Sequence, residues 1–183
     1  MFNCHHLVRI GVASLITLAV TACGGGGGGA EGAAAPERKA TSIGEAITIA
    51  EATGQYPVLD RDSTVQGVDS NANGVRDDIE NYIHALPDSP AQKAALMQLA
   101  AALNNTLTID VENQLALDNA SRTSFKGVHC LYSVYNADQA SKKGQDLQKF
   151  TVNTLVRLEA YEKYNSALSG KTMKGPKGDT CDK

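Results

Sequence analysis

The chain of 183 residues contains no tryptophan, only three phenylalanines and six tyrosines, and only five prolines. Sheet cores draw heavily on aromatic and β-branched side chains. The sequence is instead rich in alanine and leucine, so composition favours helices that pack through small residues over a β-sandwich. We expect one small all-α domain of about four helices with flexible appendages.

Excess positive charge is also lacking, because 17 basic residues stand against 20 acidic ones. No basic face of the kind that neutralises phosphates is visible, which argues against a nucleic-acid partner. The four cysteines form no CxxC pair, and no serine lies in a GxSxG setting. We find no paired-acid, triad or cofactor pattern, so the sequence does not predict an enzyme.

A long hydrophobic run is missing as well. The apolar stretch Ile10–Val20 is too short to cross a bilayer of about 30 Å. It ends in Leu18-Ala19-Val20-Thr21-Ala22-Cys23, which resembles the lipobox of bacterial lipoproteins. The resemblance implies that residues 1–22 are a signal peptide, that Cys23 is the lipid attachment site, and that the protein is anchored to a membrane of the bacterial envelope. An ordinary secretory signal is the alternative.

The lipobox is followed by six consecutive glycines, Gly24–Gly29. Such a segment cannot bury a core and behaves as a flexible coil, so we expect residues 23–40 to be a tether and residues 41–183 the folded domain. In bacterial lipoproteins, which this segment resembles, a residue such as Gly24 after the cysteine implies that the protein is located in the outer membrane, facing the periplasm or the exterior.

Oxygen-bearing side chains recur at alternate positions from Asp69 onward. A twelve-residue calcium loop takes ligands from its first, third, fifth, seventh, ninth and twelfth positions, with glycine at the sixth. Gly74 stands at the sixth position here. The sequence therefore predicts a Ca²⁺ site with these ligands, the Val75 ligand being its backbone carbonyl: Asp69, Asn71, Asn73, Val75, Asp77 and Glu80. The alternative is an Asx-rich turn that caps a helix without any metal.

The loop resembles EF-hand loops and, in its second half, the calcium loops of thrombospondin type 3 and dockerin-like repeats. Arg76 stands where an EF-hand has an apolar residue, and Gly67 argues against an entering helix. Asn71 and Asn73 are neutral, which predicts a weak site with a Kd of about 10⁻⁴–10⁻³ M. The stretch Gly67–Ile83 and the helical body also resemble small uncharacterised exported bacterial proteins, which implies no mechanism.

Helical periodicity and capping residues predict the remaining elements. Ser42 begins a short helix that Gly54 ends, and a second helix leaves the loop and stops at Pro87. Ser89 caps a third. Beyond these we expect a helix over 109–123, an interruption at Gly127 and one long helix over 138–168. The stretch 128–135 is predicted to be helical, with a short strand as the alternative.

Cys130 and Cys181 are the only cysteines left if Cys4 is removed with the signal and Cys23 is lipidated. An isolated pair in an oxidising compartment predicts a disulfide that holds the tail to the helical body. A redox or metal role with His129 is the alternative.

These features predict a calcium-binding envelope lipoprotein with a structural or partner-binding role. A calcium-independent interaction protein, of the inhibitor or immunity type, is the alternative, and an enzyme of unknown class comes third. The expected partners are the membrane, through the lipid, and an unidentified protein.

Overall fold

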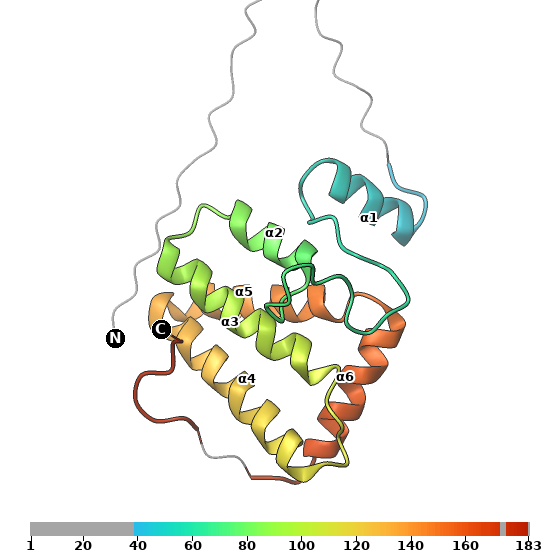
Figure 1. Ribbon diagram of the computed structural model, residues 1–183. Helices are drawn as coiled ribbons and strands as arrows, with labels where there is room; N and C mark the ends of the chain where they lie inside the picture. The colour runs from blue at the N-terminus through green and yellow to red at the C-terminus, as the bar shows by residue number, and fades with distance from the viewer. Residues whose placement is uncertain (1–38, 173–174, 183) are drawn as a thin grey trace, which may run out of the picture. The chain divides into compact units, whose positions relative to one another are not determined.

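The computed structural model describes residues 39–172 and 175–182, and every regular element in these ranges is a helix (Figure 1). The predicted all-α fold is confirmed, with six helices in the described ranges where about four were expected. They are α1 (Ile43–Ala52), α2 (Asp77–Ala85), α3 (Pro90–Thr106), α4 (Gln114–Val134), α5 (Ala137–Thr151) and α6 (Leu155–Leu168). The predicted signal peptide, Cys23 and nearly all of the tether lie outside the described residues.

Helix α3 lies at the centre of the domain and packs against α2, α4, α5 and α6. Its start is fixed by a capping box, in which Ser89 accepts from the Gln92 amide while the Gln92 side chain accepts from the Ser89 amide, with Pro90 in the first turn. Small side chains such as Ala95 and Ala100 are buried along it. They let neighbouring helices come close, as the composition predicted.

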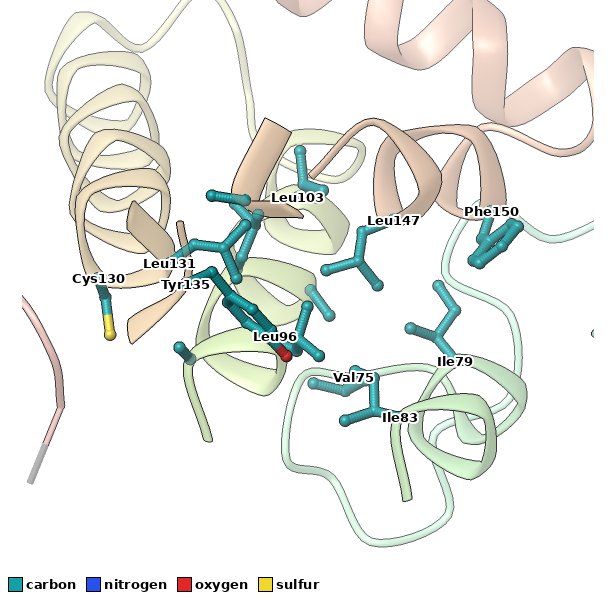
Figure 2. Close-up of a cluster of buried hydrophobic side chains, with 14 of the residues drawn as sticks. Val75, Ile79, Ile83, Leu96, Leu103, Cys130, Leu131, Tyr135, Leu147 and Phe150 are labelled. Carbon is teal, nitrogen blue, oxygen red and sulfur yellow. The ribbon is translucent and has the colours of Figure 1, made fainter. Parts of the chain in front are cut away.

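The apolar interior consists of two clusters. The first joins α2, α3, α4 and α5, and Figure 2 shows its side chains pointing toward one another, among them Ile83, Leu96, Leu131 and Leu147. The second is smaller and consists of Leu117, Ala120 and Tyr164, with side chains from the 109–111 segment and α6 packed against it.

The prediction around Gly127 is wrong. Helix α4 begins at Gln114, capped by the Asn113 side chain, and continues without a break through Gly127 to Val134. A Cβ atom at Gly127 would lie 3.0 Å from the Leu99 Cα of α3. The glycine therefore allows two helices to approach closely and does not end one.

The prediction of one helix over 138–168 is also wrong, because α5 ends at Thr151 and α6 starts at Leu155. The Thr154 hydroxyl accepts from the Arg157 amide as a new N-cap. The Asn153 side chain donates to the Asp60 carbonyl oxygen at 2.8 Å. Contacts with a segment nearly a hundred residues away thus accompany the break. Leu155, the first residue of α6, is exposed.

The predicted disulfide is present, with the Cys130 and Cys181 sulfur atoms 2.04 Å apart. It joins the C-terminal tail to α4. Gln98 of α3 adds a second attachment, because its Nε2 donates to the Thr180 carbonyl at 2.8 Å and its Oε1 accepts from the Asp182 amide at 3.1 Å. The tail is held by one covalent bond and one bidentate side chain.

Candidate metal site

The last four residues of the loop 69–80 form the first turn of α2, and two residues before that turn have left-handed backbone conformations. Ala72 has a φ of 56° and Gly74 a φ of 83°. Glycine adopts this conformation readily, whereas a non-glycine residue there costs about 1–2 kcal/mol. The local contacts of the loop must supply that energy.

Four of the six predicted ligands are brought together by hydrogen bonds. The Nδ2 atoms of Asn71 and Asn73 each lie 3.1 Å from the same Glu80 oxygen, Oε2. The two Asp69 carboxylate oxygens accept from the backbone amides of Asn73, at 3.2 Å, and Gly74, at 2.8 Å. The first, third, fifth and twelfth positions of the loop therefore form one connected polar group.

The other two predicted ligands are placed differently. The Asp77 carboxylate accepts from both the backbone amide and the hydroxyl of Ser70. Val75 has a buried side chain, and its amide donates to Asn73 Oδ1 at 2.8 Å. Among the described residues, no three His, Cys, Asp or Glu side chains are grouped so that they could hold a metal ion. Half of the predicted ligand set belongs to other types, namely two amide oxygens and one carbonyl.

Two carboxylates of the loop, those of Asp77 and Glu80, are held in their charged form. Two hydrogen bonds from Ser70 lower the pKa of Asp77. Partial burial alone would raise the pKa of Glu80, but the hydrogen bonds from His84, Asn71 and Asn73 outweigh it and lower that pKa. His84 is exposed, with its Nε2 3.3 Å from Glu80 Oε1. At neutral pH the loop presents ionised carboxylates, which is what a hard cation requires.

Arg76, the departure from the EF-hand pattern, is fully buried. Its Nε and Nη2 atoms donate to the two carboxylate oxygens of Asp78, each at 2.7 Å. Nη2 also donates to the Phe150 carbonyl at 3.0 Å, and Nη1 to that of Thr151 at 3.4 Å, at the C-terminus of α5. A cation there satisfies carbonyls that have no partner within the helix. The arginine attaches the loop to the core through hydrogen bonds, where the EF-hand pattern uses apolar packing.

A second buried arginine holds the preceding segment. Arg157 Nη1 donates to the Asp60 carbonyl at 2.6 Å, and its Nε donates to that of Val65 at 3.3 Å. Its Nη2 pairs with the carboxylates of Asp60, at 3.3 Å, and Asp62, at 3.5 Å. Burial and the neighbouring Arg76 charge lower the pKa of Arg157. Asp60 and Asp62 also accept from backbone amides two residues ahead, so they form turns.

Gly67 lies against both arginines. It has a φ of 69°, and a Cβ atom there would lie 2.2 Å from Arg76 Cδ and 2.8 Å from Arg157 Nη2. Only glycine fits. The sequence did not predict that Arg76 and Arg157 meet at Gly67, because no local pattern links Arg157 to the other two residues. The one sequence signal was an arginine at a loop position where an apolar residue is usual.

Comparison with protein-family models, curated proteins and solved structures gave no match. None of the helices in the described part of the chain is long and apolar enough to span a membrane.

Proposed function

We propose that this chain is a lipid-anchored protein of the bacterial envelope whose 69–80 loop binds one calcium ion in a structural or partner-binding role. The observation that carries the calcium proposal is the convergence of Asn71 and Asn73 on Glu80, closed by the contacts of Asp69 with Asn73 and Gly74. Positions far apart in the loop meet at one carboxylate.

The chemistry of this group fits calcium, which takes six to eight oxygen ligands in flexible geometry. Each asparagine amide would turn to present its Oδ1 to the ion in place of the N–H that now faces Glu80, and that oxygen has two acceptor sites. Asp69 and Glu80 would supply charge. Asp77 would leave Ser70 or bind through water, as ninth-position residues of such loops often do.

The proposed structural role of calcium is inferred from the different burial of the two halves of the loop. Residues 71–74 are exposed, whereas Val75, Arg76 and Ile79 are buried. The second half is attached to the core by Arg76 without any ion. Calcium would therefore order the exposed half against Glu80 at the start of α2. It would act as a permanent brace rather than a switch, and the domain would stay folded without it.

Thermal unfolding in calcium and in chelator tests this proposal. Saturation at millimolar calcium should stabilise the protein by about 1 kcal/mol, a rise in Tm of about 2–4 °C. Magnesium at equal concentration should do less, because it demands octahedral geometry and keeps its waters. Glu80→Gln should abolish the calcium shift, while Glu162→Gln on the exposed face of α6 should keep it. An equal shift in both variants would contradict the proposal.

The membrane anchor has its own test. Mass spectrometry of the protein from a bacterial envelope fraction should show a diacylglyceryl group and an amide-linked acyl chain on Cys23 as the first residue. Cys23→Ser should release the protein from the membrane fraction. Cleavage at another bond with an unmodified N-terminus would favour the ordinary secretory signal.

A further inference from the structure

A pocket of about 390 Å³ opens where α3, α4, α5 and α6 meet. Its lining includes Leu99, Leu103, Leu131 and Ala140, which are all buried. Pockets that bind small molecules usually measure about 300–1,000 Å³ and are mostly apolar. The size and the apolar floor both suit a small ligand.

The pocket lies between the two apolar clusters of the domain. Leu99, Leu103 and Leu131 belong to the first cluster, while Tyr164 belongs to the second and Tyr161 packs against it. Protein interiors are normally close-packed, with few voids larger than a water molecule. A molecule in this pocket would touch both clusters and join them into one core.

Large apolar side chains of α4 line the pocket without being covered. Phe125, Val128 and Tyr132 are 37%, 40% and 47% exposed. Their spacing of three and four residues places them on one face of the helix. Exposed apolar side chains gathered at a concavity are typical of ligand sites, because a ligand removes them from water.

The lining is free of charge. None of the described residues that line the pocket is Asp, Glu, Lys, Arg or His. Its polar groups are hydroxyls and amides, such as those of Ser124, Ser141, Gln145 and Gln148. A charged ligand would lose hydration there without gaining a partner, whereas one neutral hydroxyl or N–H could be hydrogen-bonded.

Gly144, in the middle of α5, helps to keep the pocket open. Glycine weakens a helix interior relative to alanine. A Cβ atom at Gly144 would lie 3.6 Å from Leu131 Cδ2 and 3.8 Å from Leu99 Cδ2, both ordinary contacts. Packing therefore does not demand a glycine here, in contrast to Gly127. A larger side chain at position 144 would extend toward the pocket.

We infer that this pocket is a binding site for an uncharged, mostly apolar small molecule that carries one hydrogen-bonding group. The site is separate from the 69–80 loop, since no residue of that loop lines it. Ligand binding there does not depend on calcium.

Two fluorescent probes with the same ring skeleton test the charge requirement. N-phenyl-1-naphthylamine is neutral, and 8-anilinonaphthalene-1-sulfonate adds a sulfonate. The neutral probe should bind the full chain saturably at one site, equally in calcium and in chelator. The sulfonate should bind at least about tenfold more weakly. Equal binding of the two probes, or no saturable binding of the neutral one, would overturn the inference.

Three variants test the location. Gly144→Leu should fill the pocket and weaken neutral-probe binding about tenfold or more, while Tm stays equal or rises. Val128→Glu places a charge at an exposed lining position and should weaken binding even if Gly144→Leu folds poorly. Leu115→Glu is the matched control, since Leu115 is exposed on the same helix but does not line the pocket. Unchanged binding in Gly144→Leu and Val128→Glu would overturn the assignment.

Discussion

Two irregular segments of the domain, 59–76 and 175–182, are held by different chemistry. The first is fixed by Arg76 and Arg157, whose guanidinium groups bind backbone carbonyls and carboxylates inside the protein. The second is fixed by the Cys130–Cys181 bond and by Gln98. The first depends on charge and the second on oxidation, so the two attachments can be broken separately.

The largest effect should come from Arg157→Ala. Removing one partner of a buried ion pair leaves the other uncompensated and typically costs about 3–5 kcal/mol. Arg157→Lys should recover little of this, because an ammonium lacks the planar fork that reaches several acceptors. Urea unfolding measures both. Arg122→Ala, at an exposed position on α4, is the control and should change stability by less than about 0.5 kcal/mol. A similar loss in the control would remove the special role of Arg157.

Breaking the second attachment should cost somewhat less. The cysteines are 51 residues apart, and on the chain-entropy model a loop of this size gives about 4 kcal/mol, less any strain. The Cys130→Ala, Cys181→Ala double variant should lose about 2–4 kcal/mol in urea unfolding. A reductant should destabilise the native protein, leave this variant unchanged, and act on Arg157→Ala as on the native protein. Strong non-additivity would show that the two attachments are coupled.

Gly67→Ala tests how closely the two arginines are packed. Gly67 and Gly54 both have left-handed backbones, with φ values of 69° and 70°. A Cβ atom at Gly54 meets nothing within 4 Å, whereas at Gly67 it overlaps Arg76. Gly54→Ala should therefore cost only the backbone strain of about 1 kcal/mol, and Gly67→Ala about 2–3 kcal/mol. Equal losses in urea unfolding would mean that the arginines move aside without cost.

Acid should weaken the arginine-held segment. Burial alone would raise the pKa of Asp60, but amide hydrogen bonds from Asp62 and Val68 and the charges of Arg157 and Arg76 lower it. A folded pKa below the unfolded value of about 3.9 gives stability that is present above that value and is lost as pH falls through the folded pKa. Asp60→Asn should show a smaller stability loss between pH 5 and pH 3 than the native chain. An unchanged loss would assign it to other carboxylates.

Local signals predicted the fold where local chemistry decides it. Ser42 and Ser89 cap helices as expected, and Gly54 follows the end of α1. The disulfide followed from the small number of cysteines. The helix caps depend on residue type and near neighbours alone.

The errors came from contacts between distant segments. Glycine is a residue type that often interrupts helices, so Gly127 was predicted to end one. Only the position of Leu99 in α3 shows that the glycine allows α3 and α4 to pack closely. The break after Thr151 is accompanied by the contacts of Asn153 and Arg157 with Asp60, which no periodicity can reveal. In the 69–80 loop the spacing predicts the ligands, and that remains a prediction. The structure adds that Asn71 and Asn73 both contact Glu80, and that Asp69 accepts from the Asn73 amide.

Isothermal titration of calcium into chelator-treated protein would measure directly whether the 69–80 loop binds the ion. The native chain should bind one ion with a Kd of about 10⁻⁴–10⁻³ M. Asp69→Asn should weaken binding, Glu80→Gln should abolish the heat, and Glu162→Gln should bind like the native chain. No saturable heat at millimolar calcium, or unchanged binding in Glu80→Gln, would contradict the account.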